Sequence, residues 1–357
     1  MRHGLPESHE DLREYYRTKA DEFIQDILGL QCRDFHKAWL ELRNENEKSL
    51  LLAPRGHGKS EVATIAWSVW RLAYDHDLRI LIVSASAMNA ERFAGKIRAD
   101  FETNAQLLEL FPGLRASKND KWTNRAFTIS GRSQPHEIPT ITALGAGSAV
   151  TSGHYDIVIL DDIIDLDDVT NEDMLRKKLE WYDNVLDPVA DHELHLSGTR
   201  WHMADIYGEL LERNKKVEEF AFRIDKALYS EGDELPFDRE FINGFACLWP
   251  DGPPRNCSLE RLLNLRATNA QAFSLQRQNE PTGGPLAKFR KEWFRYGEWE
   301  GKLVQPHYQI FQYVDFSAFG EKATSDFFVV STIALAGNQL WILDIYRQHQ
   351  PTFREQA

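Results

Sequence analysis

Short apolar runs alternate with longer amphipathic segments along most of the chain. The run 79–87 is nearly unbroken, as expected for a strand that is buried on both faces. In segment 60–75, Val62, Ile65 and Val69 recur at a spacing that predicts a helix. The same two patterns predict further strands at 49–54, 126–130, 140–145, 156–162 and 192–198, and further helices at 9–28, 89–104 and 259–278. Strands that alternate with helices indicate an α/β fold with a doubly wound parallel sheet.

The pattern changes towards the C-terminus. A turn-rich break at 249–258 precedes the last of those helices, and the stretch "NEPTGGP" at 279–285 reads as connecting chain. Beyond about residue 305, three apolar strands predict a β-meander, at 308–318, 326–335 and 340–348. We therefore expect a first domain at 1–285 with an N-terminal helical segment at 1–48, a linker at 286–304 and a second domain at 305–357.

Composition and charge limit the class of protein. The 357 residues are 42% hydrophobic and 27% charged, which is ordinary for a soluble globular protein. The net charge of −13 argues against a protein that coats nucleic acid through its overall charge. Basic clusters at 176–178, 213–216 and 288–291 could still touch phosphates, or could simply be solvated faces. The sequence has neither an apolar run of the roughly 18 residues that span a bilayer nor a secretory signal, so we expect a cytoplasmic protein.

A zinc site and a disulfide framework are both disfavoured. The three cysteines, Cys32, Cys247 and Cys257, are scattered and form no C-x-x-C pair. The string "HELH" at 192–195 is not H-E-x-x-H, and on a strand His192 and His195 point to opposite faces.

The stretch "APRGHGKS" at 53–60 directly follows a predicted strand and opens a predicted helix. In this context a glycine-containing loop cradles a triphosphate with its backbone N–H groups, while a lysine reaches the outer phosphates and a hydroxyl holds Mg²⁺. Lys59 and Ser60 have these roles here, and Gly56 and Gly58 keep the loop free of bulk. We therefore expect the nucleotide to be bound by the loop residues Arg55, Gly56, His57, Gly58, Lys59 and Ser60. Ala53 departs from the usual glycine, which the turn permits if its φ is negative.

Two carboxylates supply the other half of such a site. The apolar strand "YDIVILDD" at 155–162 ends in Asp161, which would hold Mg²⁺, and Asp162, which could orient or deprotonate the attacking water. The acids that follow, Asp165, Asp167 and Asp168, are expected to be solvated.

Two further sites are candidates near the same sheet edge. The Arg55 guanidinium could stabilise charge on the γ-phosphate, or could be a surface arginine. The segment "HLSGTRWHMADIY" at 195–207 brings Thr199 and Arg200 to the carboxyl edge, where ligands of open α/β sheets bind. Such a polar turn can sense the γ-phosphate, although taken alone it could be an ordinary strand-to-helix connection.

Taken together, these motifs resemble the large subunit of viral terminases of tailed bacteriophages. The resemblance runs from about residue 30 to the end, through "LLLAPRGHGKSE", "RILIVSASAMNAERF", "GAGSAVTSGHYDIVILDDIID", "SGTRWHMADIYGEL" and "SLQRQNEPTGG…KEWF". It implies an ASCE-type P-loop NTPase, followed by the start of a ribonuclease-H-like nuclease domain. It further implies ATP and Mg²⁺ on Lys59, Ser60 and Asp161, with Asp162, Arg55, Lys59 and Arg200 as catalytic residues. Thr199 and Arg200 would lie in a motif that couples hydrolysis to motion, and Phe35 and His36 would grip the adenine.

The resemblance also implies a biological role. Such a chain translocates double-stranded DNA into a procapsid in the host cell cytoplasm, and a nuclease cuts the concatemer. Its implied partners are DNA, the portal protein and a small terminase subunit, and its implied assembly is a homo-oligomeric ring on the portal. No membrane partner is implied.

The sequence departs from the family pattern at three places. Asp162 stands where the family has glutamate, and His154 occupies the region of a suspected trans-acting arginine, so that finger is unidentified. In the nuclease, Asp315 would be the first carboxylate for Mg²⁺ or Mn²⁺ and Asp326 could assist, but the other acids would fall beyond residue 357. We therefore expect a nuclease that is cut short and inefficient.

Two other functions remain open. A P-loop helicase would need a second core lobe with arginines that face the nucleotide, and the region after 285 offers a meander instead. A nucleotide-binding assembly protein without turnover is the non-enzymatic alternative, supported by the departures at Ala53 and Asp162.

Overall fold

The computed structural model describes residues 6–115, 122–133, 137–150, 153–170, 172–281, 295, 308–315, 327–336 and 339–349. The chain divides into two compact units, 1–289 and 290–357. The domain boundary expected at 285 and nearly all of the expected linker at 286–304 lie outside the described residues, so both stay predictions. Within the described residues, no helix is long and apolar enough to cross a membrane.

A seven-stranded sheet forms the centre of the first unit. Its strands, in the order of the sheet, are β3 (Ala126–Phe127), β4 (Ile141–Gly145), β2 (Ile80–Ser84), β5 (Tyr155–Asp161), β6 (Ala190–Gly198), β1 (Lys48–Leu52) and β7 (Ala221–Ile224). Every neighbouring pair is parallel except β3 with β4. One strand, β6, separates β1 from β5. The α/β fold class expected from the sequence is therefore confirmed.

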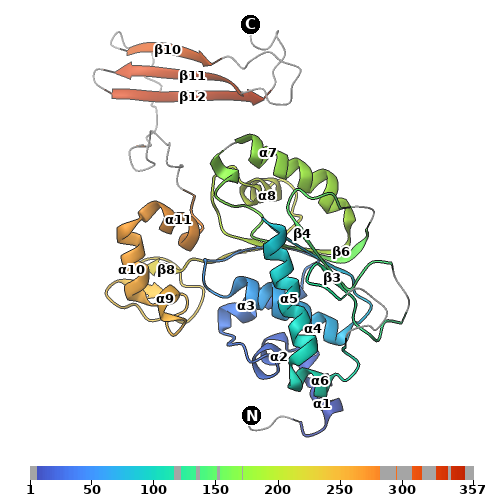
Figure 1. The fold of residues 1–357 in the computed structure, drawn as a ribbon. Coiled ribbons are helices and arrows are strands. Elements are labelled where there is room, and N and C mark those ends of the chain that lie inside the picture. Colours follow the sequence, from blue (N-terminus) through green and yellow to red (C-terminus); the bar gives the residue numbers. More distant parts are fainter. Residues whose placement is uncertain are drawn as a thin grey trace. The chain divides into compact units, whose positions relative to one another are not determined.

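Helices cover both faces of this sheet (Figure 1). Alternate side chains of β2 enter two different apolar clusters: Ile80 and Ile82 face one side, and Leu81 and Val83 face the other. The first face packs against α1 (His9–Tyr16), α2 (Ala20–Asp26), α4 (Trp67–Tyr74), α5 (Ala87–Thr103) and α6 (Ala105–Leu110). The second face packs against α7 (Glu172–Trp181) and α8 (Ile206–Asn214). Burial on both faces explains why the strands read as continuous apolar runs.

Several expected helices are divided in the structure. The segment 9–28 forms two helices rather than one, and 259–278 divides into α10 (Leu259–Thr268) and α11 (Ala270–Gln278). Asn269 separates the last two because its non-helical backbone ends α10 while its side chain accepts a hydrogen bond from the Ala272 N–H and caps α11. The helix expected at 60–75 begins as a π-helix, η1 (Ser60–Ala66), and continues as α4.

A smaller layer packs against the end of β1, the strand that precedes residues 53–60. It contains β8 (Leu228–Ser230), β9 (Phe245–Cys247), α9 (Pro254–Cys257), α10 and α11, which lie together in Figure 1. Its apolar residues join α3 (Asp34–Asn44) and the end of β1 in one cluster around Phe35, Trp39 and Trp249. This layer therefore forms part of the support beneath residues 53–60.

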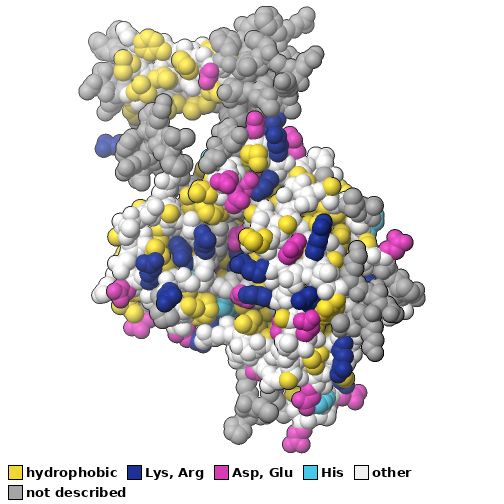
Figure 2. Space-filling view, in the orientation of Figure 1, with side chains coloured by type: hydrophobic (Ala, Val, Ile, Leu, Met, Phe, Trp, Pro, Cys, Tyr) yellow, Lys and Arg dark blue, Asp and Glu magenta, His cyan; other side chains and the backbone are white. Residues whose placement is uncertain are grey.

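The second unit contains an antiparallel meander, in the order β10 (Tyr308–Asp315), β11 (Phe327–Ala336) and β12 (Gln339–His349). The three strands expected from the sequence are confirmed, whereas their membership of a ribonuclease-H-like domain stays a prediction. Apolar side chains gather on this sheet in Figure 2, and Phe311, Tyr313 and Leu340 are more than half exposed.

Among the described residues of the first unit, three histidines are buried. Burial lowers the pKa of His36 and His195 to about 4 and that of His57 to about 3. Although His195 Nε2 lies 3.0 Å from a Glu193 oxygen, we treat this contact as a hydrogen bond from a neutral ring, because Arg71 already pairs with both oxygens of that carboxylate. All three rings are therefore neutral in the folded protein near pH 7.

We expect the first unit to lose stability as the pH falls from about 6.5 to 4. Unfolded histidines bind protons below about pH 6.5, whereas the folded rings do so only near pH 4 or below, so each site disfavours the folded state by roughly 2–3 kcal/mol at pH 4. Chemical denaturation at pH 7, 6, 5 and 4 measures the effect. His195→Gln should flatten the slope and the exposed His192→Asn should leave it unchanged; equal slopes for wild type and His195→Gln would contradict this assignment.

Candidate nucleotide-binding site

The loop 53–60 has the backbone that its glycines suggest. Gly56 and Gly58 adopt φ values of 83° and 82°, which residues other than glycine rarely adopt. Ala53 is fully buried and is not among the described residues with positive φ. Its N–H donates to the Gly198 carbonyl of β6 at 3.1 Å. The alanine therefore continues the strand, so the departure from glycine does not disturb the loop.

The loop meets the acidic end of β5 directly. Lys59 Nζ donates to Asp162 Oδ1 at 2.6 Å, and Ser60 Oγ donates to Asp161 Oδ1 at 3.0 Å. Although these segments are about 100 positions apart in sequence, parallel strands bring their carboxyl ends to one edge. The lysine, the hydroxyl and both carboxylates expected from the sequence are therefore brought together, while the chemical role of each stays a prediction.

Asp161 has the surroundings of a magnesium ligand. Its carboxylate is completely buried, and burial raises its pKa, opposed by Lys59 and by hydrogen bonds from Thr64 and Ser60. Carboxylate and hydroxyl oxygens suit Mg²⁺, which usually takes one or two protein carboxylates and completes its shell with water and substrate phosphates. Among the described residues no cluster of three His, Cys, Asp or Glu side chains could hold a metal alone. Ser60 and Asp161 therefore fit Mg²⁺ that arrives with a phosphate ligand.

Asp162 adopts an uncommon backbone conformation. Its φ is +48°, and it is held there because its N–H donates to the Ser197 carbonyl at 2.8 Å while its carbonyl accepts from the Ala85 N–H at 3.1 Å. Aspartate enters this left-handed region more readily than most side chains. This gives a physical reason for aspartate here in place of the longer glutamate.

The outer side of the loop is held by the α9–α11 layer, and the sequence patterns did not indicate this contact. The Arg55 N–H donates to the Gln276 carbonyl at 2.9 Å, and the Arg277 guanidinium donates to the Arg55 carbonyl. Cys257 Sγ lies 3.6 Å from the Gly56 carbonyl. The Arg55 guanidinium is exposed and reaches Gln276 Oε1 at 3.3 Å, so its action on a γ-phosphate stays a prediction.

Phe35 and His36 lie beneath the loop. Both rings are completely buried and pack edge-on against Trp39 and Trp249. His36 Nε2 lies 2.8 Å from the His57 carbonyl oxygen. The pair therefore supports the loop from below in this conformation, and the expected contact with adenine stays a prediction.

The turn after β6 is fixed by buried polar contacts. Thr199 and Arg200 are both buried, and the Arg200 guanidinium pairs with Asp205, the residue that caps α8. The Arg200 N–H donates to Asn279 Oδ1 at 3.1 Å, and the Asn279 amide donates to the Asp225 carbonyl at 2.9 Å. The turn thus touches the residue that ends α11, while the coupling role of Thr199 and the catalytic role of Arg200 stay predictions.

The other acidic and basic candidates have different surroundings from the site. Asp315 is exposed at the end of β10, and Asp326 lies outside the described residues. Asp168 was expected to be solvated, but this is wrong: its side chain is buried because it pairs with Lys178 and accepts from the Asp165 N–H. In the basic cluster 213–216, Arg213 pairs with Asp183, which weakens the case for phosphate contacts there.

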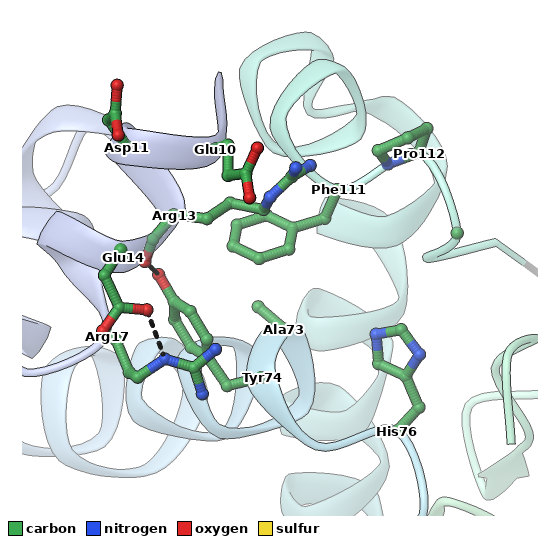
Figure 3. A pocket seen from close by; sticks show the side chains of 11 residues that line it. Glu10, Asp11, Arg13, Glu14, Arg17, Ala73, Tyr74, His76, Phe111 and Pro112 are labelled. Atoms are coloured by element: carbon green, nitrogen blue, oxygen red, sulfur yellow. Dashed lines mark hydrogen bonds and ion pairs between the residues drawn. The ribbon is translucent and has the colours of Figure 1, made fainter. Parts of the chain in front are cut away.

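A cavity of about 640 Å³ lies between α1, the end of α4 and the turn after α6 (Figure 3). None of the site residues above lines it. Several of its charged and polar groups are already engaged: Arg17 Nε donates to Glu14 at 3.0 Å, and the Tyr74 hydroxyl donates to the Arg13 carbonyl at 2.7 Å. This cavity is separate from the loop and the end of β5.

Comparison with known proteins gives several similarities to phage terminases. The terminase large subunit of Enterobacteria phage T3 is 34% identical over 120 residues, which is 33% of this chain and 19% of that protein. No protein-family model matches. Similar solved structures include the large terminase of bacteriophage HK97 (TM-score 0.48, 13% identity, 93% of this chain and 67% of that one). Another is the large terminase ATPase domain of Thermus phage P74-26 (TM-score 0.47, 15% identity, 73% and 97%). A third is the large terminase of another thermophilic bacteriophage, in complex with ADP (TM-score 0.42, 9% identity, 89% and 68%).

The curated match confirms the resemblance to the large subunit of phage terminases that the motifs indicated. The matched part of this chain covers about a fifth of the length of that relative.

We expect Gly58→Ala to abolish nucleotide binding, whereas Gly147→Ala leaves it intact. Both glycines have a φ of 82°, so both substitutions carry a similar backbone strain of about 1 kcal/mol. A Cβ on Gly58 would lie 3.0 Å from His36 Nε2, but one on Gly147 would meet nothing within 4 Å. Calorimetric titration with Mg·ATPγS, alongside thermal unfolding, compares the two; equal affinities in two folded variants would contradict the loop assignment.

Proposed function

We propose that this chain is an ATP-hydrolysing motor subunit that translocates double-stranded viral DNA into a procapsid. The observation that carries the proposal is the meeting of Lys59 and Ser60 with Asp162 and Asp161 at one sheet edge. A glycine-lined loop, an ammonium, a hydroxyl and two carboxylates are the parts that phosphoryl transfer from a nucleotide requires. The similarity to a terminase large subunit supports the choice of DNA packaging as the work performed.

Phosphate binding would begin with an exchange of partners. Lys59 is 5% exposed and its ammonium is paired with Asp162, so the lysine has to leave this carboxylate to reach the outer phosphates. The loop N–H groups and the first turn of η1 would cradle the phosphates. Mg²⁺ held by Ser60 and Asp161 would neutralise the phosphate charge that develops during transfer.

The exchange would free Asp162 for catalysis. Its side chain is 43% exposed at the sheet edge, so a water molecule can reach it. Once it no longer pairs with Lys59, the carboxylate would orient the attacking water and accept its proton. Arg55 would act from the loop on the charge of the γ-phosphate.

The structural change caused by hydrolysis would be transmitted through the turn after β6. The loss of the γ-phosphate would change the contacts of Thr199 and Arg200, and Arg200 is hydrogen-bonded to the end of α11 through Asn279. We propose a homo-oligomeric ring on the portal protein, supplied with DNA by a small terminase subunit in the host cell cytoplasm. Of the alternatives, a helicase is disfavoured because the second unit has an antiparallel meander, and a protein without turnover is separated by the phosphate-release assay below.

A nuclease is the second candidate function. Asp315 ends the first strand of an antiparallel meander, which supports a carboxylate for Mg²⁺ or Mn²⁺ there, and Asp326, further along the sequence, could assist. Two-metal cleavage needs several converging carboxylates. We propose weak cleavage by this chain, and among the described residues no cluster of three such side chains occurs.

Slow ATP hydrolysis by the purified chain should be abolished by Lys59→Ala and strongly reduced by Asp161→Ala. The first substitution removes the phosphate-binding cation, and the second removes the metal carboxylate, each with an expected loss of at least about 100-fold in turnover. A phosphate-release assay measures the rate, and Lys215→Ala, at an exposed position after α8, is the matched control. Unchanged turnover in both site variants would remove the assignment.

The same preparation should nick supercoiled DNA only weakly with Mg²⁺ or Mn²⁺, because cleavage with two metal ions needs several converging carboxylates. Gel electrophoresis of the plasmid gives the nicked fraction. Robust nicking that disappears in Asp315→Ala would overturn this expectation.

A further inference from the structure

A second hydroxyl lies on the carboxylate of Asp161. Thr64 Oγ1 donates to Asp161 Oδ2 at 2.5 Å, while Ser60 Oγ donates to Oδ1 at 3.0 Å. Each oxygen of the carboxylate therefore has its own hydroxyl donor from the same helical segment. Thr64 is completely buried, so its hydroxyl has no access to bulk water.

The π-helical turn that follows the loop places these two hydroxyls together. Ser60 and Thr64 lie four positions apart in η1, and such a spacing directs both side chains towards the same neighbour. A π-helical turn is rare and is found most often at functional sites. The Thr64 carbonyl also accepts from Ser68 Oγ at 2.6 Å, which fixes the backbone of Thr64 independently of its side chain.

A buried arginine holds this segment against the sheet. Arg43 is 1% exposed and donates to the Ala63 carbonyl, the residue before Thr64. Its other amino group donates to Ser197 Oγ on β6 at 3.3 Å, and its guanidinium lies 5.3 Å from the centre of the Trp67 ring. The position of Thr64 relative to the sheet is thus set by α3 and β6 and does not depend on the loop.

The two hydroxyls cannot serve Asp161 equally once a cation is bound. When Ser60 Oγ binds a cation through a lone pair and Asp161 Oδ1 faces the same cation, the direction of the Ser60 O–H is constrained and its hydrogen bond to Oδ1 would be weakened. Thr64 Oγ1 donates to the other oxygen, Oδ2, so its hydrogen bond to the carboxylate does not depend on how Ser60 and Oδ1 meet the cation. We propose that Thr64 is a positioning residue for the Mg²⁺ site: it holds Asp161 by Oδ2 and thereby presents Oδ1 to the metal.

This inference rests on the proposed ATPase site and adds a residue to it. Ligating side chains are oriented by hydrogen bonds from outside the coordination shell, and the loss of such a bond typically costs 10- to 100-fold in metal affinity. Thr64 therefore affects the binding of the metal with its nucleotide, and has little effect on the nucleotide alone.

The test separates metal from nucleotide. ADP binding to the full 357-residue chain is measured by calorimetry, once in EDTA and once in Mg²⁺. In Thr64→Val the affinity in EDTA should match that of the wild type, while the gain in affinity on adding Mg²⁺ should fall by about tenfold or more. Thr64→Ser keeps a hydroxyl and should restore the gain.

Two further variants control for folding and for loss of a buried hydroxyl. Ser68→Ala removes a buried hydroxyl from the neighbouring turn that is bonded only to backbone, and it should keep the full Mg²⁺ effect. If Thr64→Val fails to fold by thermal unfolding, Thr64→Cys keeps the size with a weak donor and should also lose most of the Mg²⁺ effect.

The outcomes distinguish failure of the proposed function from failure of the role of Thr64. A wild-type chain that binds no ADP under either condition removes the proposed function and this inference with it. A wild-type chain with a clear Mg²⁺ effect that is equally strong in a folded Thr64→Val or Thr64→Cys overturns the role of Thr64 alone.

Discussion

The contact between the glycine loop and the two carboxylates of β5 is the constraint on which the site depends. It requires β1 and β5 to end at the same edge with β6 between them, and the parallel pairing of all three strands provides this arrangement. It also requires a loop backbone that places Lys59 and Ser60 on the side of the sheet edge, and two glycines at positive φ allow it. The fold is in this sense a frame for two hydrogen-bonded pairs, Lys59 with Asp162 and Ser60 with Asp161.

The central part of this frame could be predicted from the sequence because it is encoded in short contiguous strings. The loop and the acids at 161–162 each follow an apolar run, so their positions at strand ends follow from strand length and the parallel topology. The strands of the meander and the burial of the central strands on both faces were equally visible, since alternation and apolar runs are local properties of a segment. The division of segment 259–278 at Asn269 could not be predicted, because this polar residue fits the helical pattern on either side of it.

The residues that support the loop could not be predicted in this way. Thr64 reaches a partner 97 positions away, and Arg277 reaches the Arg55 carbonyl across 222 positions. Threonine inside an apolar helix and arginine near a helix end are common, so their residue types carry no signal until the tertiary structure brings the partners together. The same holds for Phe35 and His36: the family resemblance implies a contact with adenine, and only the packing reveals that both rings lie under the loop.

The end of α11 has a mechanical consequence. Its last turn holds the loop through Gln276 and Arg277, and Asn279 at its C-terminus, in the left-handed conformation, is bonded to the turn after β6. The chain continues from this helix into the segment that precedes the second unit. A pulling force on the polypeptide beyond residue 281 would therefore load the same few hydrogen bonds that shape the loop, so that tension and nucleotide occupancy act on one short stretch of backbone.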